Sequence, residues 1–194
     1  MTRIIKTGLY FGSFNPVHIG HLAIANFMIE FTDLEQLWFV VSPQNPLKEK
    51  KSLLKDYHRL EMVRLATEDD DRFMASDIEF KLPTPSYTID TLTYLEEKHS
   101  GREFLLVMGA DGLRTFHKWK HADLIAQKYQ RIIYPRPGTD PETIAKTPNA
   151  TLVDAPLMEI SSSFIRQAVK DGKDIRHLVP AKAYQYMREM HFYK

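Results

Sequence analysis

The sequence of 194 residues contains no cysteine. This absence excludes disulfides, thiolate metal sites and cysteine nucleophiles, and it suits the reducing compartment of a cytoplasmic protein, which we expect here. The chain also lacks a run of about 18 apolar residues, the length that a membrane span requires. Residues 1–6 carry charge where a secretion signal would be apolar, so we expect a first strand there and no membrane partner.

An excess of charge of one sign is missing as well. The 26 basic and 25 acidic residues leave a formal net charge of +1, which gives no reason to expect nucleic acid as a partner. Positive charge gathers only locally, between Lys48 and Arg59. Such a stretch suits a polyphosphate as well as a solvated loop, and both interpretations stay open. Arg59 itself is predicted to lie on a helix face rather than to bind a ligand.

Short apolar runs alternate with amphipathic stretches along the chain. The runs predict buried strands over 4–11, 37–41, 104–108 and 131–134, and spacings of three to four predict helices around 22–29, 60–65 and 92–95. Segment 135–149 is rich in proline and glycine and is expected to be a long loop. Helices are predicted over 161–171 and 180–190, with Pro180 as a first helical residue. The alternation predicts an α/β fold with a doubly wound, mainly parallel sheet, helices on both faces and one domain over 1–194.

A segment suited to bind phosphate follows the first predicted strand directly. It reads Gly12-Ser13-Phe14-Asn15-Pro16-Val17-His18-Ile19-Gly20-His21, and the pattern turns helical from there. Gly12 lets the backbone approach a ligand, and Ser13 and Asn15 offer hydrogen bonds. A helix start also presents unpaired N–H groups with a partial positive charge. The segment therefore predicts an anion site at a strand-to-helix junction.

His18 and His21 are expected to share one face of the first helical turn, because they are three residues apart. Gly20 leaves that face without a side chain that would block a ligand. The imidazoles can act as a general base, donate hydrogen bonds to a transferring phosphoryl group, or ligate a metal. A zinc site needs a third protein ligand, which this segment lacks, so no metal ligands are predicted. Two histidines that only cap a helix are the structural alternative.

Motifs later in the chain also carry side chains that are suited to bind a ligand. Ser161-Ser162-Ser163 precedes a helical Phe164-Ile165-Arg166, so hydroxyls, helix amides and a guanidinium gather as a second phosphate cradle, although simple N-capping is the alternative. Asp111 follows a strand that ends near Gly109, where α/β folds hold ligand-binding groups, but it could also cap a helix. Trp119 has polar neighbours, so stacking on a flat ring competes with core packing.

These motifs resemble the signature of the H-x-G-H nucleotidyltransferase superfamily. Within it, the chain resembles bacterial nicotinate mononucleotide adenylyltransferases along nearly its whole length. The resemblance rests on residues 42–48 (SPQNPLK), 85–91 (PSYTIDT), 109–111 (GAD), 118–119 (KW) and 160–166 (ISSSFIR), which follow the histidine segment in the same order. The chain departs from the family at Phe11, where a second glycine is more usual.

The resemblance implies a role for each matching residue. The catalytic residues would be His18, His21 and Arg166. ATP would be bound by Gly12, Ser13, Phe14, Asn15, Gly20, Lys48, Gly109, Asp111, Arg136, Ser161, Ser162 and Ser163. The mononucleotide would be held by Ser86, Tyr87 and Thr88, with Trp119 over its pyridine ring. Segment 160–194 would be a C-terminal helical part that completes the ATP site, and Mg²⁺ would arrive with ATP rather than occupy a protein metal site.

The implied reaction transfers AMP from ATP to nicotinate mononucleotide, giving nicotinate adenine dinucleotide and pyrophosphate in NAD biosynthesis, by in-line attack without a covalent enzyme intermediate. ATP and the mononucleotide are then the partners, and the oligomeric state is left open, a homo-oligomer included. An adenylyltransferase for nicotinamide mononucleotide or phosphopantetheine, or a cytidylyltransferase, would use the same phosphate motifs. A non-catalytic nucleotide-binding sensor is the alternative of another class, but it would not need paired histidines.

Overall fold

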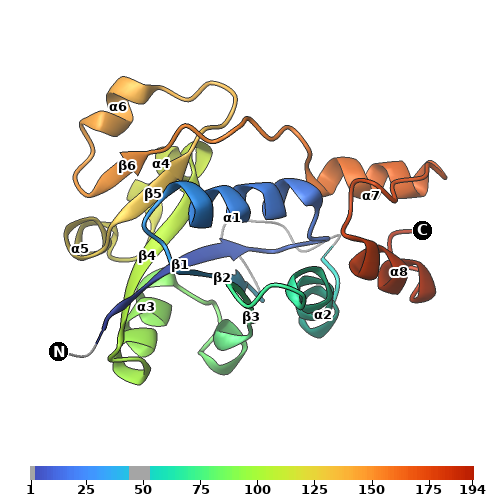
Figure 1. Cartoon of the computed structure of the whole chain (residues 1–194), viewed down its shortest axis with the longest axis horizontal. Helices are drawn as coiled ribbons and strands as arrows, with labels where there is room; N and C mark the ends of the chain where they lie inside the picture. The colour runs from blue at the N-terminus through green and yellow to red at the C-terminus, as the bar shows by residue number, and fades with distance from the viewer. Residues whose placement is uncertain (1–2, 44–52) are drawn as a thin grey trace.

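A computed structural model describes residues 3–43 and 53–194, which form one sheet with helices on both sides (Figure 1). The strands are β1 (Ile5–Gly12), β2 (Gln36–Val41), β3 (Phe73–Ser76), β4 (Arg102–Gly109), β5 (Arg131–Tyr134) and β6 (Ala150–Leu152). The α-helices are α1 (Ile19–Phe31), α2 (Asp56–Thr67), α3 (Thr88–Lys98), α4 (Ala110–Thr115), α5 (Ala122–Lys128), α6 (Pro141–Ala145), α7 (Ser162–Lys170) and α8 (Ala181–Glu189). Two short 3-10 helices are η1 (Ile78–Lys81) and η2 (Phe116–Lys118).

The sheet has the strand order β3-β2-β1-β4-β5-β6, and every neighbouring pair is parallel. The predicted doubly wound α/β fold is therefore confirmed. The chain builds outward from β1 to β3 and then crosses to β4 on the other side of β1. In open parallel sheets, a crevice lies beyond the carboxyl ends of the strands at this reversal point. Here the two strands at the reversal end at Gly12 and Gly109.

Side chains of the sheet alternate between two cores, because successive residues of a strand point to opposite faces. On one face, Tyr10 and Val107 pack with buried residues of α1, α2, α7 and α8. On the other face, Leu9 and Leu106 pack with buried residues of α3, η2, α5 and α6. Both faces are apolar, as parallel strands require. The rigid sheet between these cores fixes where the loops after β1 and β4 begin.

The structure corrects several details of the predicted elements. The predicted strands are all present within two residues, but β3 and β6 were not predicted. Segment 135–149 is not entirely a loop, because Asp140 caps α6 by accepting hydrogen bonds from the backbone N–H groups of Glu142 and Thr143. Pro180 is the N-cap of α8, one position before the predicted place in the first turn.

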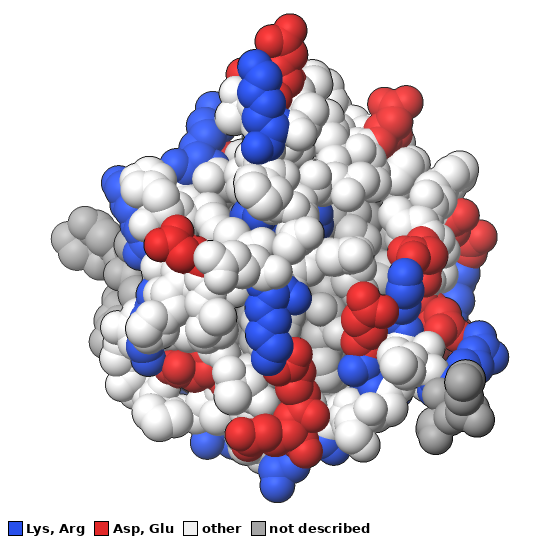
Figure 2. Space-filling view, turned by 90° about the vertical axis from the view of Figure 1, so that its left-hand side faces the viewer, with Lys and Arg blue, Asp and Glu red and all other residues white. Residues whose placement is uncertain are grey.

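Charged side chains of both signs are interspersed on the face shown in Figure 2. The described residues also contain ion pairs between side chains of opposite charge, such as Lys120–Asp90 at 2.9 Å. The pattern agrees with the formal net charge of +1. None of the helices in the described residues combines the length and the apolar character that crossing a membrane requires.

Candidate active site

The loop between β1 and α1 closes tightly at the reversal point of the sheet. Phe14 has a backbone φ of 43°, in the left-handed region, and its ring turns back over Gly12. A Cβ atom added to Gly12 would lie 2.7 Å from that ring, so glycine is the residue that fits here. The loop backbone therefore stays close to the end of β1, where a ligand can reach it.

His18 and His21 lie together at the start of α1. His18 is the N-cap of the helix rather than a member of its first turn, and the two rings stack with 3.7 Å between their centroids. The backbone N–H of His18 donates to Nδ1 of His21 at 3.2 Å, so the capping alternative is part of this arrangement. Because Nδ1 accepts a hydrogen bond, a neutral His21 carries its proton on Nε2 and can donate from that atom.

His18 is buried, with 5% of its surface exposed, and its Nδ1 has no hydrogen-bond partner within the described residues. A Cβ atom at Gly20 would lie 3.1 Å from this nitrogen, so Gly20 leaves the space that the ring needs. Burial, assisted by the positive charge of Arg136, lowers the pKa of His18 to about 4. His18 is therefore neutral near pH 7.

Helix α7 begins beside this loop, although 146 residues separate Pro16 from Ser162. The Ser162 hydroxyl donates to the Pro16 carbonyl at 2.9 Å, and Nη1 of Arg166 donates to the Asn15 carbonyl at 2.8 Å. Ser161 caps α7 by accepting from the Phe164 N–H, as the capping alternative states. The two segments that the sequence predicts to be phosphate cradles are thus hydrogen-bonded to each other.

The loop and α7 together line a pocket of about 400 Å³, which we call the histidine pocket. Its wall contains most of the residues implied for catalysis and ATP binding, namely Gly12, Ser13, Phe14, Asn15, His18, Gly20, His21, Arg136, Ser161, Ser162, Ser163 and Arg166. Arg136 is held there by a hydrogen bond from its Nη1 to the Met158 carbonyl at 2.8 Å. Lys48, also implied for ATP binding, lies outside the described residues.

A second pocket of about 500 Å³, which we call the tryptophan pocket, contains the residues implied for the mononucleotide: Ser86, Tyr87, Thr88 and Trp119. Helix α3 begins inside the sequence motif, at Thr88, so N–H groups of its first turn lie at this wall. Trp119 is half-buried and lies 5.3 Å from the Phe116 ring, so it both joins the core and lines the pocket. The buried hydroxyl of Ser86 has no hydrogen-bond partner within the described residues.

Glu79 is a residue of the tryptophan pocket that the sequence did not point to. Only 2% of its surface is exposed, and it accepts a hydrogen bond from the Thr91 hydroxyl at 3.0 Å. Burial raises the pKa of its carboxyl group, while hydrogen bonds from Ser42 and Thr91 act in the opposite direction. The available signal was a single acid between two large apolar residues, Ile78 and Phe80.

The two pockets meet at the end of β1, because Phe11, Gly12 and Ser13 line both. Phe11, the departure from the family pattern, thus lies on their shared wall. Gly109 and Asp111 line the tryptophan pocket and not the histidine pocket. Asp111 nevertheless reaches towards the histidine pocket, since its Oδ1 lies 4.0 Å from Nε of Arg136.

No group of three or more metal-ligating side chains, of the His, Cys, Asp or Glu type, gathers in the described residues. Among the described residues, the acidic side chains that line the two pockets are Asp111 and Glu79, both in the tryptophan pocket. The described walls of the histidine pocket instead carry hydroxyls, imidazoles and guanidinium groups.

Comparison with known proteins places this geometry among nucleotidyltransferases. The family model described as cytidylyltransferase-like matches residues 9–168. A probable nicotinate-nucleotide adenylyltransferase of Flavobacterium johnsoniae is 51% identical over 98% of this chain and 100% of the relative. One of Bacteroides thetaiotaomicron is 46% identical over 95% of this chain and 92% of the relative.

Solved structures agree on the fold. The nicotinic acid mononucleotide adenylyltransferase of Plasmodium falciparum, in complex with NaAD, superposes with a TM-score of 0.81 at 20% identity and covers 97% of each chain. The same protein in complex with APC gives a TM-score of 0.80 at 20% identity and the same coverage. At this identity the likeness is one of fold.

Proposed function

The chain belongs to the nicotinate-nucleotide adenylyltransferase family, and we propose that its histidine pocket binds ATP and its tryptophan pocket binds nicotinate mononucleotide. The enzyme transfers AMP between them, giving nicotinate adenine dinucleotide and pyrophosphate in NAD biosynthesis. The observation that carries this assignment is the shared wall at Gly12 and Ser13, where the two pockets meet. Two ligands that meet at this wall can bring one reacting phosphate group next to the other.

In the proposed reaction, a phosphate oxygen of the mononucleotide attacks the α-phosphorus of ATP in line. A new P–O bond forms, the bond between the α-phosphorus and the bridging oxygen to the β-phosphate breaks, and pyrophosphate leaves with the electron pair. The attacking phosphate is already ionised near pH 7, so no general base is required. Catalysis then consists of positioning the two phosphates and stabilising the charge that develops between them.

His21 and His18 have different parts in this mechanism. His21 offers an Nε2 donor because its Nδ1 is used by the His18 backbone. His18 is buried and neutral in the absence of ligand, and the negative charge of a bound triphosphate favours its protonated form. Arg166, anchored to the Asn15 carbonyl, adds a fixed positive charge to the same pocket. The three side chains together compensate the charge of the transferring group.

The remaining residues of the histidine pocket hold ATP. Ser13, Asn15 and the serines at the start of α7 surround the phosphates with hydroxyls and backbone N–H groups. Asp111, which lies on the wall of the tryptophan pocket 4.0 Å from Arg136, accepts hydrogen bonds from the ribose hydroxyls of ATP, and Arg136 lies at the adenine side. Mg²⁺ neutralises phosphate charge when it is bound, and we assign it to the ATP phosphates and water, because the described residues gather no cage of ligands.

The acceptor lies in the tryptophan pocket. Trp119 stacks on the pyridine ring, and the carboxylate of the nicotinate faces the first turn of α3, at Tyr87 and Thr88. An anion is stabilised at a helix N-terminus, which favours the acid over the amide form of the mononucleotide. Segment 160–194 belongs to the same domain as a C-terminal helical part, because α7 contributes to the histidine pocket.

A pyrophosphate-release assay with MgATP tests this proposal directly. The acceptors are nicotinate mononucleotide, nicotinamide mononucleotide and phosphopantetheine, and the first is expected to react fastest. Faster release with another acceptor would contradict the assignment of the tryptophan pocket. If no acceptor released pyrophosphate while ATP bound, the chain would be a nucleotide sensor.

A further inference from the structure

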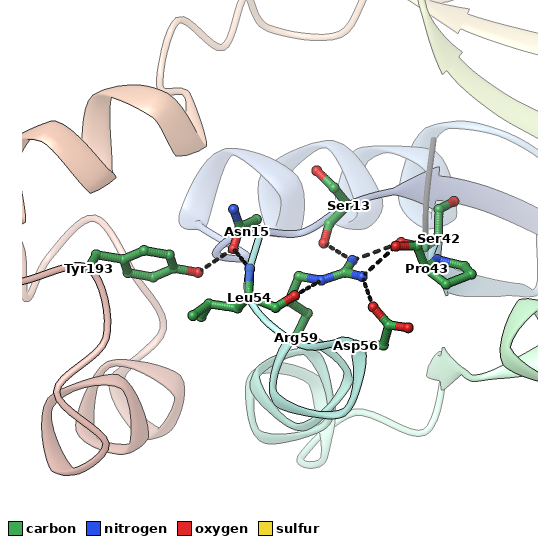
Figure 3. A network of polar contacts seen from close by, with 8 residues as sticks. All are labelled: Ser13, Asn15, Ser42, Pro43, Leu54, Asp56, Arg59 and Tyr193. Carbon is green, nitrogen blue, oxygen red and sulfur yellow. Dashed lines mark hydrogen bonds and ion pairs between the residues drawn. The ribbon is translucent and has the colours of Figure 1, made fainter. Parts of the chain in front are cut away.

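Arg59 in α2 is completely buried, with 0% of its surface exposed. It lies in a helix, as the sequence analysis expects, but on a face that packs inward against the loops after β1 and β2. Its side chain runs from α2 to the carboxyl ends of β1 and β2 (Figure 3). A buried guanidinium is stable only when its charge and its donors are satisfied.

All five N–H donors of the Arg59 guanidinium are used (Figure 3). Nε donates to the Leu54 carbonyl at 3.0 Å, and Nη1 donates to the carbonyls of Ser13 at 2.5 Å and Ser42 at 2.9 Å. Nη2 donates to the Pro43 carbonyl at 3.3 Å and to Oδ1 of Asp56 at 2.7 Å. One side chain thus fixes the loop after β1, the end of β2 and the entry to α2.

Asn15, two residues after Ser13 in the same loop, is held by hydrogen bonds from other parts of the chain. Oδ1 of Asn15 accepts a hydrogen bond from the Tyr193 hydroxyl at 2.7 Å and from the Leu54 N–H at 3.3 Å (Figure 3). Arg59 and Tyr193 therefore act on Ser13 and Asn15, which both line the histidine pocket.

We propose that Arg59 and Tyr193 are positioning residues that hold the Ser13–Asn15 segment of the loop in the geometry required by the transition state. The inference rests on the proposed function of the histidine pocket. Neither residue lines that pocket or needs to touch a substrate. Each acts through the loop, whose N–H groups and side chains must be aligned with the phosphates before reaction.

The kinetic consequence is a loss of turnover rather than of ATP affinity. Alignment of donors around the reacting phosphorus is realised in the transition state, so an error in loop position lowers kcat, whereas the adenine and ribose contacts still hold ATP. A displacement of about 1 Å can cost on the order of 100-fold in rate. An arginine at this place cannot be replaced by lysine, which keeps the charge but has three donors instead of five.

The test compares Tyr193→Phe with a matched control, Tyr186→Phe. The hydroxyl of Tyr186 lies 2.7 Å from Nδ1 of His58 and links the C-terminal part to α2. Among the residues that the structure describes, this hydroxyl has no hydrogen bond to the loop after β1. We expect Tyr193→Phe to lower kcat about fivefold, the effect of one hydrogen bond, with KM for ATP within about twofold of the wild type. Tyr186→Phe should keep the wild-type kcat. Arg59→Lys, if it folds, should lower kcat on the order of 100-fold.

If Tyr193→Phe and Tyr186→Phe had equal kcat values while the wild type was active, the inference would be overturned. Equal values would mean that the Tyr193 hydroxyl contributes no more to turnover than a hydroxyl with only a structural role. An inactive wild type would instead overturn the proposed function. In that case, amide hydrogen exchange in the loop tests whether Tyr193 positions it. Amides of residues 12–15 should exchange faster in Tyr193→Phe but not in Tyr186→Phe, and equal exchange in the two variants would disprove the inference.

Discussion

At the level of single residues, the two histidines differ in what surrounds them. His21 is half-buried and held by the His18 backbone, by the stacked His18 ring and by the Phe14 ring at 5.1 Å. His18 is buried and has an unpartnered Nδ1 among the described residues. A ring that is fixed before the substrate arrives loses little entropy when it binds the transition state.

Replacing His21 by alanine should therefore lower kcat about 10²–10³-fold, as expected for the loss of one stabilising donor, while ATP affinity changes little. Pyrophosphate release under saturating substrates measures the first quantity, and titration with a non-hydrolysable ATP analogue measures the second. The exposed His177, which lines neither pocket, is the control for a histidine-to-alanine change. Normal turnover in His21→Ala would show that this histidine is not catalytic.

His18 should also make the stability of the protein depend on pH. Its pKa is about 4 in the folded chain and about 6.5 in an unfolded chain, so the unfolded state binds the proton more tightly. Above about pH 6.5 the ring is neutral in both states and the free energy of unfolding does not depend on it. As the pH falls from 6.5 towards 4, the unfolded state takes up the proton first, and the free energy of unfolding decreases. Between pH 7 and pH 5 this amounts to about 2 kcal/mol.

Urea unfolding of the wild type and of His18→Asn, each at pH 7 and pH 5, measures this contribution. The variant lacks the titrating group, so its free energy of unfolding should fall by about 2 kcal/mol less than that of the wild type. All other histidines contribute equally to both proteins and cancel in the comparison. If the free energy of unfolding decreased equally in the wild type and in His18→Asn, His18 would not be buried as a neutral ring.

At the level of helices and strands, the sequence predicted the parts whose signals are local. The strands β1, β2, β4 and β5 are continuous apolar runs, and the loop after β1 carries its own glycine, proline and histidines. The strands β3 and β6 have 4 and 3 residues at the two edges of the sheet, too short to show a period. Arg59 was missed for a different reason: its partners are backbone carbonyls of Ser13 and Ser42, which no side-chain pattern reveals.

The wall formed by α3 and the segment after η2 gives a prediction at this scale. Trp119 lines the tryptophan pocket, and aromatic stacking on a flat ring contributes about 1–3 kcal/mol. Trp119→Ala should therefore raise KM for nicotinate mononucleotide about 5- to 150-fold and leave KM for ATP nearly unchanged. Trp119→Phe should recover much of the affinity. An equal rise in both KM values would show that Trp119 supports the whole fold instead of one pocket.

At the level of the whole molecule, the order of the strands explains why distant segments form one site. The sheet reverses between β1 and β4, and the ends of these strands carry Gly12 and Gly109 into the two pockets. Helix α7 then returns to the β1–α1 loop, which it contacts through Ser162 and Arg166. The topology thus brings α7, near the end of the chain, to the loop after β1 in the histidine pocket, whereas the tryptophan pocket combines the end of β1 with residues 79–120.

This division predicts two distinct patterns of protection in hydrogen exchange. A non-hydrolysable ATP analogue should slow exchange in residues 12–21 and, at the same time, in residues 161–166, because both segments line the histidine pocket. Nicotinate mononucleotide should instead slow exchange around residues 86–91, at the start of α3. At a ligand concentration of about 100 times Kd, the stabilisation of about 2.7 kcal/mol corresponds to roughly 100-fold slower exchange for amides that open only in the free protein. If the ATP analogue protected residues 12–21 but not residues 161–166, the C-terminal part would not belong to the ATP site. If the ATP analogue alone protected residues 86–91, the ligands assigned to the two pockets would have to be exchanged.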